Sequence, residues 1–327
     1  MLKDKITTPI LLLVFNRPEK TKRVFDVIKN VQPKKLYIAA DAPRSHVSSD
    51  ADNCSSVRAI VSQIDWDCDA KFLFHKKNLG CSLAGKTAWD WFFDQEEEMI
   101  FIEDDGLVSV SFFAFCQEML EIYRNDTQIA YIGGVNYGPK YGNSSYFFSR
   151  LPAATYCMAT WKRVYDLYDY RMESYKSIRG MDSFRNKFSN KFEFDFFSEK
   201  FDSYVINGGN TYDIQMIYLV YKYEMYSIVP NINLASNIGL DSGANNNLAP
   251  DSARAIKLGN RPRFELTKIV HPDLVELDHK FDMEYFRVRV LYGESWTSAI
   301  FRFYICKYLR PAYRAILKKP LEFLGLR

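Results

Sequence analysis

The sequence lacks the cysteine and histidine spacings that hold structural metals. Its six cysteines include no Cys-x-x-Cys pair, and its four histidines are dispersed along 327 residues. Zinc sites of the finger or ribbon type need such pairs at short spacing, and disulfide frameworks are typical of much shorter secreted chains. We therefore expect a reduced, cytoplasmic protein without a cysteine- or histidine-based metal centre.

Long apolar runs and a strong net charge are also lacking. No apolar stretch approaches the roughly 20 residues that a membrane-spanning helix needs, and the first residues do not have the charged, apolar and small-residue parts of a signal peptide. The net charge of +3 is too small to indicate a nucleic-acid partner. We expect no nucleic acid among the partners and, at most, contact with a membrane surface.

Glycine-rich phosphate loops are missing where two classes of nucleotide enzyme would carry them. The first apolar segment, residues 9–15, is followed by Asn16-Arg17-Pro18-Glu19. A NAD-linked enzyme would have Gly-x-Gly-x-x-Gly at this place, so that class is excluded. A nucleotidyltransferase would have a basic, Gly-rich loop there, yet it stays an alternative because it uses the same kind of sheet and metal-binding carboxylates.

The composition favours a globular protein with a large core, because 47% of the residues are hydrophobic and 25% are charged. Apolar segments typical of buried strands alternate with segments of helical periodicity. This alternation predicts an α/β fold with a mostly parallel, doubly wound sheet and flanking helices. The expected strands are residues 9–15, 36–40, 70–74, 99–102, 129–133 and 226–230, and the expected helices are residues 19–29, 57–64, 83–93, 112–123 and 211–222.

Polar side chains follow each of the first four expected strands. In a doubly wound sheet, ligands bind at the carboxyl ends of the strands, where the strand order reverses. We therefore expect these side chains to converge on one rim of the sheet. They are Asn16 with Arg17, Asp41 with Arg44, His75 with Asn78, and Glu103-Asp104-Asp105, which we call the acidic triplet.

The acidic triplet is an unusual ending for a buried strand. Like charges repel, so three successive carboxylates are tolerated only when they are solvated or neutralised by a cation. Hard carboxylate oxygens suit Mg²⁺ or Mn²⁺, which bridge carboxylates and phosphates and act as Lewis acids on a diphosphate leaving group. A solvated acidic turn is the alternative, but the apolar residues before the triplet and Phe112-Phe113 after it favour a functional site.

An ordered series of motifs resembles the GT-A-fold glycosyltransferases, in particular the N-acetylglucosaminyltransferase I family and related bacterial sugar transferases. The resemblance covers about residues 8 to 275. Its segments are Val14-Phe15-Asn16-Arg17-Pro18, Asp41, Asn78-Leu79-Gly80-Cys81, the acidic triplet, Ala159-Thr160-Trp161, Tyr212-Asp213-Ile214-Gln215 and residues 231–239. It implies a GT-A-like (Rossmann-like) fold and transfer, with inversion, of a sugar from a nucleotide sugar, UDP-linked in the first place, to a hydroxyl of a glycan or lipid-linked acceptor.

The resemblance also implies roles for individual residues. Asp105 would coordinate the metal ion, Mn²⁺ or Mg²⁺, that bridges the two phosphates, and Glu103 and Asp104 would contact the ribose or the donor sugar. For Lys86, a phosphate contact and an ordinary solvated helix lysine remain equally open. The residues expected around the base and the phosphates are Asn16, Arg17, Asp41, His75, Asn78 and Lys86.

Inverting transfer needs one carboxylate to deprotonate the acceptor hydroxyl. Asp213, near the start of an expected helix, is the candidate, although an acid in a first helical turn is also favourable to the helix dipole without any catalysis. Trp161 and Tyr212 are candidates for stacking on an acceptor sugar, with a place in the core as the alternative. The polar loop of residues 231–247 could close over the donor.

Two segments depart from the related bacterial sequences. Tyr156-Cys157-Met158 stands where they carry Trp-Gly-Trp, so the shape of the acceptor pocket is not carried over. Asp241 and Asn245–Asn247 stand where many of them have a histidine. A second protein ligand for the metal is therefore not implied.

The end of the chain is basic and aromatic. From Arg302 onward there are seven basic residues and a single acid, Glu322, interleaved with apolar side chains. Such a segment suits the surface of an anionic bilayer, and a helix packed on the main domain is the alternative. We expect residues 1–260 to form the transferase domain and residues 261–327 a helical extension in contact with the inner face of the cytoplasmic membrane. A non-catalytic carbohydrate-binding protein remains a further alternative.

Overall fold

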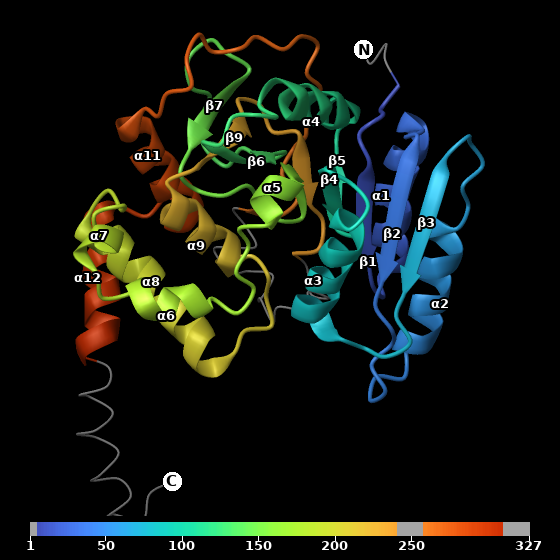
Figure 1. The fold of residues 1–327 in the computed structure, drawn as a ribbon, viewed down its shortest axis with the longest axis horizontal. Coiled ribbons are helices and arrows are strands. Elements are labelled where there is room, and N and C mark those ends of the chain that lie inside the picture. The colour runs from blue at the N-terminus through green and yellow to red at the C-terminus, as the bar shows by residue number, and fades with distance from the viewer. Residues whose placement is uncertain (1–4, 241–257, 310–327) are drawn as a thin grey trace, which may run out of the picture.

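Figure 1 shows the fold in a computed structural model that describes residues 5–240 and 258–309. Strands and helices alternate through the first half of the chain, as the sequence predicts. The strands are β1 (Ile10–Val14), β2 (Lys35–Ala40), β3 (Asp69–Phe74), β4 (Glu98–Glu103), β5 (Gly106–Val108), β6 (Ile129–Gly133), β7 (Tyr146–Ser149), β8 (Cys157–Trp161), β9 (Tyr226–Pro230) and β10 (Ala235–Asn237). The helices are α1 (Pro18–Val31), α2 (Asp50–Val61), α3 (Gly80–Phe93), α4 (Val110–Ile122), α5 (Lys162–Tyr165), α6 (Glu173–Ile178), α7 (Asp182–Arg185), α8 (Lys191–Asn207), α9 (Ile214–Tyr223), α11 (His279–Val290) and α12 (Trp296–Tyr304), followed by a π-helical turn η1 (Ile305–Leu309).

The main sheet has eight strands in the order β3-β2-β1-β4-β8-β6-β9-β7. β1 pairs in parallel with both β2 and β4, and β2 pairs in parallel with β3. Both faces of these central strands are covered, which explains their continuous apolar runs. The predicted α/β class, with a mostly parallel sheet, flanking helices and C-terminal helices, is confirmed.

Three antiparallel pairs make the sheet mixed, which the sequence analysis does not predict. β8 runs antiparallel to both of its neighbours, β4 and β6, and β7 runs antiparallel to β9. A second, two-stranded sheet pairs β5 with β10, so that Asn237 lies opposite Gly106. This small sheet holds residues 235–237 directly beside the residue that follows the acidic triplet.

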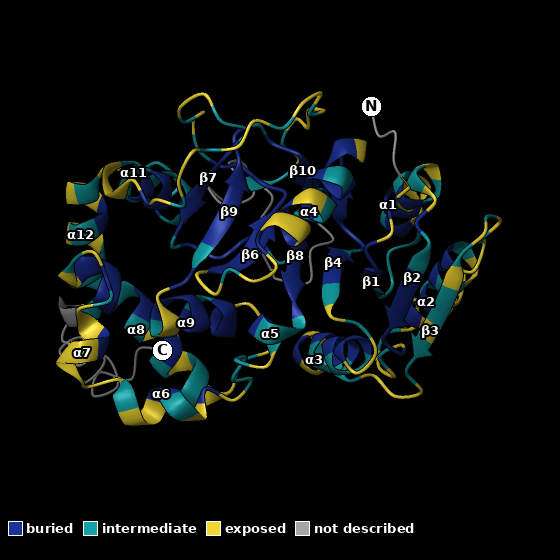
Figure 2. Ribbon diagram, turned by 45° about the horizontal axis from the view of Figure 1, so that its top comes forward, coloured by how far each residue is buried: buried dark blue, intermediate teal, exposed yellow. Residues whose placement is uncertain are grey.

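The helices cover both faces of the sheet, and Figure 2 shows the buried strands between them. α1 packs on α2 and α4, whereas α3 packs on β1 and β2. The chain moves in one direction across the sheet from β1 through β2 to β3, and then returns past β1 to β4. Because crossovers between parallel strands are right-handed, this reversal puts α1 and α2 on one face of the sheet and α3 on the other. The strand order therefore reverses between β1 and β4, which is where a ligand is expected in this class of sheet.

The C-terminal helices pack on the rest of the protein. α11 contacts β7, and Arg150 after β7 forms an ion pair of 3.1 Å with Asp282 of α11. Phe303 of α12 makes an edge contact with Phe192 of α8. The division into residues 1–260 and 261–327 stays a prediction, and the basic segment beyond residue 309 lies outside the described residues.

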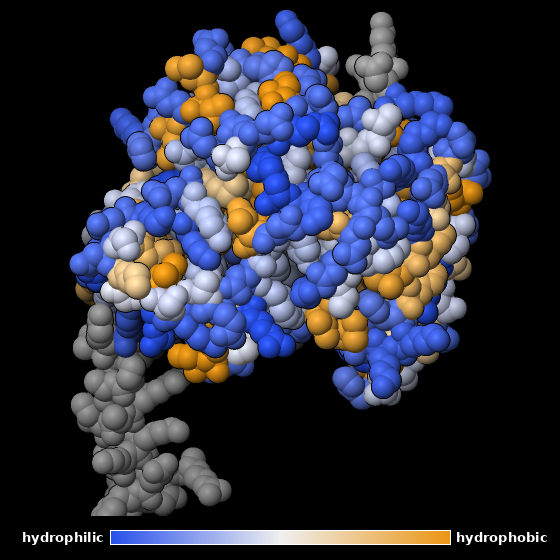
Figure 3. All heavy atoms as spheres, in the orientation of Figure 1, coloured by the Kyte–Doolittle hydropathy of each residue, from blue (hydrophilic) through white to orange (hydrophobic). Residues whose placement is uncertain are grey.

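No helix within the described ranges is long and apolar enough to cross a membrane. On the face drawn in Figure 3, apolar side chains form separate patches among hydrophilic ones. Contact of the C-terminal segment with a membrane surface therefore stays a prediction.

Candidate functional site

The acidic triplet lies at the point where the strand order reverses. Glu103 ends β4 and pairs with Leu13 of β1, so the loops that follow β1 and β4 lie side by side. The backbone amide of Phe15 donates to Asp104 Oδ2 at 3.1 Å. Arg17 Nη1 lies 2.7 Å from Asp105 Oδ2 and 3.5 Å from Asp104 Oδ1. The predicted meeting of Arg17 and the triplet on one rim is thus what the structure shows.

Burial perturbs all three carboxyl groups. Desolvation, reinforced by the charge of Asp105, raises the pKa of Glu103 to about 8. Desolvation also raises the pKa of Asp104 to about 6 and that of Asp105 above its ordinary value, although the Arg17 guanidinium opposes both shifts. The rim therefore holds more acid than its one contacting arginine neutralises. Perturbed groups of this kind are typical of functional sites.

The residues present fit a divalent cation only in part. Asp105 Oδ1 is buried and accepts no hydrogen bond from the described residues, which is costly for a carboxylate unless a cation or donor joins it. No group of three acidic, histidine or cysteine side chains could enclose a metal within those residues. Mg²⁺ and Mn²⁺ need only one or two carboxylates when phosphates complete the coordination. Asp105 therefore fits an ion that arrives with a diphosphate.

Gly239 closes the other side of Asp105. The backbone amide of Ile238 donates to the carbonyl of Asp105 at 2.9 Å, and a Cβ added to Gly239 would stand 1.9 Å from Asp105 Oδ2. Only glycine permits this approach, which the small β5–β10 sheet imposes. Of the loop of residues 231–247 predicted to close over the donor, residues 241–247, which include Asp241 and Asn245–Asn247, lie outside the described residues.

Asp41 has a structural task that the sequence does not reveal. Its carboxylate accepts the backbone amides of Ala42, Leu79 and Gly80 at 2.8 to 3.1 Å, and the side-chain amide of Asn78 at 3.0 Å. The group thereby anchors the loop before α3 and the start of that helix. With its oxygens so engaged, Asp41 and Asn78 are held together on the rim, and contact of Asp41 with a base remains only a prediction.

Asn16 lies on the same rim but faces Asp50, a residue that the sequence analysis does not single out. Asn16 Nδ2 donates to Asp50 Oδ1 at 2.7 Å, and Arg44 Nε donates to Asp50 Oδ2 at 2.6 Å. The hydrogen bond from Arg44 lowers the pKa of Asp50 to about 2. The one sequence signal for Asp50 is an acid in the first turn of α2, which suits the helix dipole.

His75 follows β3 and borders the same part of the rim. Its Nε2 lies 3.2 Å from Thr87 Oγ1, and burial lowers its pKa. Arg58, also missed by the sequence analysis, donates to the backbone carbonyls of His75 and Asp41 at 3.0 and 3.2 Å. His75 is therefore tied to the loop that carries Asp41, without contact to the acidic triplet.

Lys86 and Trp161 are not brought to the triplet. Lys86 pairs with Asp90 one helical turn further along α3. Trp161 pairs with Glu98, at the opposite end of β4 from Glu103, and its side chain is 2% exposed with its indole nitrogen bonded to a carbonyl of α4. The prediction that Trp161 stacks on an acceptor is wrong, because this antiparallel strand carries it into the core.

Tyr212 reaches the acidic triplet by its hydroxyl, which donates to Glu103. Its ring packs so closely on α3 that a Cβ added to Gly85 would lie 2.8 Å away. At 4% exposure, Tyr212 has no open face for a sugar, so the predicted stacking role is wrong and the alternative, a place in the core, is what the structure shows.

Asp213 follows Tyr212 and is exposed. Its carboxylate accepts the hydroxyl of Thr211. Its negative charge contributes to the raised pKa of Glu103 and of Cys81, so Asp213 lies near the rim. Cys81 is an exposed residue, but desolvation of its thiol, with the charges of Glu103 and Asp213, raises the pKa of that thiol to about 12.

Cys157, the departure from the bacterial pattern, lies within the sheet. It pairs with Ile102 of β4 and is fully buried. The carbonyl of its neighbour Tyr156 accepts the amide of Glu103 at 3.0 Å and lies 2.1 Å from a Cβ added to Gly106. The segment thus supports the backbone of the triplet from below rather than lining an acceptor pocket.

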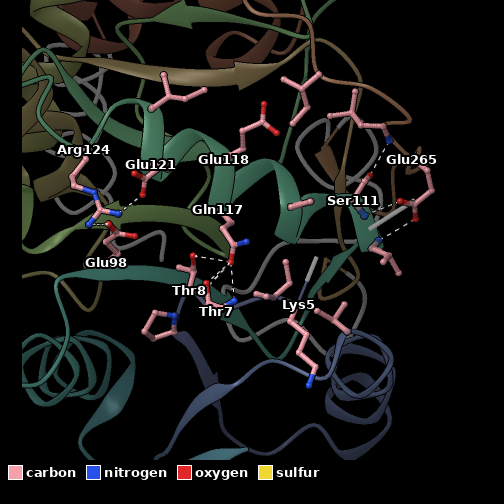
Figure 4. A pocket seen from close by; sticks show the side chains of 18 of the residues that line it. Lys5, Thr7, Thr8, Glu98, Ser111, Gln117, Glu118, Glu121, Arg124 and Glu265 are labelled. Atoms are coloured by element: carbon pink, nitrogen blue, oxygen red, sulfur yellow. Dashed lines mark hydrogen bonds and ion pairs between the residues drawn. The ribbon is translucent and has the colours of Figure 1, made fainter. Parts of the chain in front are cut away.

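A large surface cavity of about 1350 Å³ lies elsewhere, before β1 and β4 and along α4 (Figure 4). In it, Gln117 Oε1 accepts the backbone amides of Thr7 and Thr8 at 2.8 and 3.1 Å, and Glu265 accepts the first amides of α4. Size alone would favour this cavity as the site. We place the site at the triplet instead, because the perturbed carboxylates and the strand reversal coincide there.

The mixed α/β sheet and the acidic rim at its strand reversal define a protein of the α/β class with a candidate site for a cation and an anionic ligand. No protein-family model matches the sequence, and no curated protein does. Solved structures similar to this chain include HddC from Yersinia pseudotuberculosis, with 10% identity and a TM-score of 0.30 over 48% of this chain and 78% of that one. A UDP-glucose pyrophosphorylase complexed with UDP-glucose has 10% identity and a TM-score of 0.28 over 49% and 79% of the two chains. At these TM-scores the likeness supports no conclusion about activity.

Proposed function

We propose that the chain is a glycosyltransferase that moves a sugar from a nucleoside-diphosphate sugar to a hydroxyl group. One observation carries the proposal: the acidic triplet is buried at the strand reversal, beside Arg17, and one oxygen of Asp105 has no partner among the residues that the structure describes. A buried acidic cluster of this kind is costly unless a cation and an anionic ligand complete it. A diphosphate with its divalent ion supplies both.

The donor would lie along the rim between β1 and β4. Arg17 suits a phosphate because its planar guanidinium forms paired hydrogen bonds to phosphate oxygens. Asp105 would hold Mn²⁺ or Mg²⁺, and the ion, when bound, supplies charge stabilisation for the departing diphosphate. Glu103, which contacts Tyr212, and Asp104, which accepts the Phe15 amide, would then contact hydroxyls of the ribose or the donor sugar.

Asp213 is the proposed base. It is exposed at the start of α9, two residues beyond Thr211, and its charge acts on Glu103. An acceptor hydroxyl that meets Asp213 could lose its proton as it attacks the anomeric carbon on the side opposite to the diphosphate. This geometry corresponds to transfer with inversion.

The acceptor would be a glycan or a lipid-linked glycan. The proposal for a lipid carrier rests on the basic, aromatic composition after Arg302, which would bring a cytoplasmic enzyme to an anionic membrane surface. Bacterial surface-polysaccharide assembly is the setting that the motif resemblance implies.

Nucleotidyl transfer is the second candidate, because an acidic rim with a cation also serves the attack of a sugar phosphate on a nucleotide. The loop Asn16-Arg17-Pro18-Glu19 after β1 counts against it, since it lacks glycine and has one basic residue. The two reactions differ in their products. A glycosyltransferase releases nucleoside diphosphate, whereas a nucleotidyltransferase exchanges pyrophosphate with a nucleotide sugar.

The test is a panel of nucleotide sugars with Mn²⁺ and a mixture of glycan acceptors, assayed separately for released nucleoside diphosphate and for pyrophosphate exchange. We expect diphosphate release by the wild type. Asp213→Asn should lose it while it keeps its affinity for UDP, because the variant removes a base and leaves the rim intact. Asp182→Asn, an exposed acid in the first turn of α7, is the matched control and should keep full activity. Full activity of Asp213→Asn would remove Asp213 from the mechanism, and absence of any cation-enhanced nucleotide binding would refute the proposed function.

A further inference from the structure

Arg17 stands where a metal ion would neutralise the acidic triplet. Its Nη1 contacts carboxylate oxygens of both Asp105 and Asp104, at 2.7 and 3.5 Å. The arginine side chain is 17% exposed, and the two carboxylates are 11% and 10% exposed. Screening by water is weak at such burial, so this ion pair contributes substantially to the electrostatic stabilisation of the two buried carboxylates.

Both oxygens of Asp105 are closed to an ion that arrives alone. Oδ2 is covered by Arg17 and by the backbone of Gly239. Oδ1 is buried and has no hydrogen-bond partner among the described residues. A hydrated divalent cation would have to displace a guanidinium from a mostly buried pair and lose water in exchange for one carboxylate. Mg²⁺-type ions give up water reluctantly, so this exchange is unfavourable without further ligands.

A diphosphate changes this balance in two ways. Its oxygens offer the guanidinium a paired set of acceptors, which is the geometry that arginine prefers. The same oxygens supply the additional ligands that a divalent ion needs beside a single carboxylate. Movement of Arg17 from Asp105 to phosphate would open the one oxygen that the ion requires.

We propose that Arg17 is a resident counter-cation, so that a divalent ion reaches Asp105 only together with a nucleoside diphosphate that draws the guanidinium away. The inference rests on the proposed function for the choice of ligand. It assigns Arg17 a positioning role that a plain donor contact would not have. Metal and nucleotide must then bind cooperatively, and each must raise the affinity of the protein for the other by the same factor.

The first experiment uses the wild-type protein and the electron paramagnetic resonance signal of free Mn²⁺. Mn²⁺ is titrated alone and in the presence of saturating UDP, with UDP in buffer as the blank. We expect Mn²⁺ alone to bind at least about tenfold more weakly than in the presence of UDP, within the usual range of coupling between linked ligands. Equal Mn²⁺ affinity with and without UDP would overturn the proposal.

The second experiment removes the charge of Arg17. Arg17→Met keeps the unbranched stem of the side chain and removes the guanidinium, and we expect it to bind Mn²⁺ in the absence of UDP at least about tenfold more tightly than the wild type. Arg44→Met is the matched control, because Arg44 lies on the same rim but pairs with Asp50 at 2.6 Å. An unchanged Mn²⁺ affinity in Arg17→Met, or an equal gain in Arg44→Met, would contradict the counter-cation.

The wild-type titration decides the question by itself if Arg17→Met does not fold. Failure of the proposed function gives a different pattern. If neither UDP nor any other nucleoside diphosphate binds, the proposed function is refuted, whereas a gain of Mn²⁺ binding in Arg17→Met would still support the counter-cation role.

Discussion

The replacement Asp41→Ala tests whether this carboxylate supports the rim or serves the ligand. Asp41 is 5% exposed and accepts hydrogen bonds from the amides of Ala42, Leu79 and Gly80 and from the side chain of Asn78. A hydrogen bond to a charged group contributes about 1.5–3 kcal/mol. The four are not additive, because water can reach some of the released donors once the loop relaxes. We expect Asp41→Ala to lower the free energy of unfolding by about 3–5 kcal/mol.

Urea unfolding at neutral pH measures this difference. A loss of this size is about a fifth or more of the roughly 5–15 kcal/mol that stabilises a typical domain, so the midpoint should shift well outside error. Asp52→Ala is the control, because Asp52 is an exposed acid in the first turn of α2. It should change the free energy of unfolding by no more than about 0.5 kcal/mol.

The variant Asp41→Asn separates the two roles. An asparagine keeps one acceptor oxygen and loses the other, so a structural carboxylate predicts a loss of stability of about 1–3 kcal/mol. A carboxylate that serves only the base predicts weaker UDP binding at unchanged stability. A loss of less than about 1 kcal/mol in Asp41→Ala would show that these hydrogen bonds do not stabilise the folded protein.

Three further changes follow from the same geometry. Gly239→Ala should weaken binding of UDP with Mn²⁺ in calorimetry by about tenfold or more, because its Cβ would stand 1.9 Å from Asp105 Oδ2; unchanged affinity would show that the loop yields freely. Asp50→Asn should lower the free energy of unfolding by about 2 kcal/mol at pH 7, since Arg44 lowers the pKa of Asp50 from 3.8 to about 2. This stabilisation exists above pH 3.8 and is lost as the pH falls through about 2, so the difference from the wild type in urea unfolding should shrink between pH 7 and pH 2.5. A difference that stays constant over this range would contradict the assignment. Trp161→Phe should leave transfer within about twofold of the wild type while it lowers stability by about 1–3 kcal/mol, and a selective loss of transfer would restore a role at the acceptor.

The order of strands and helices in the first half of the chain could be predicted because the apolar runs of its central strands are buried on both faces. β1 and β4 are examples, since their apolar side chains are buried apart from the half-buried Leu13. β8 could not be predicted in this way. Its sequence, Cys-Met-Ala-Thr-Trp, has neither a long apolar run nor a period of two. Its place between β4 and β6 is decided by tertiary packing rather than by local pattern.

The rim itself could be predicted from the rule that parallel strands end together, but the partners on it could not. Asn16 faces Asp50 and Lys86 faces Asp90 because each polar group finds the nearest complementary group in three dimensions. The Lys86–Asp90 pair could have been predicted, because residues four positions apart in a helix are neighbours on its surface. It contains no signal for Asn16 with Asp50, since the two lie 34 positions apart.

The buried acids on this rim differ in how many hydrogen-bond donors surround them, and this difference indicates which of them could bind a ligand. Asp41 is surrounded by donors on both oxygens, as a structural carboxylate with about four lone-pair positions should be. Within the described residues, Asp104 accepts one backbone amide and forms an ion pair of 3.5 Å with Arg17, and Asp105 has one oxygen without any donor. Folding alone would favour more donors or fewer acids at this place. The deficit is concentrated at the carboxyl end of β4, where the strand order reverses, and a cation with its diphosphate would remove it.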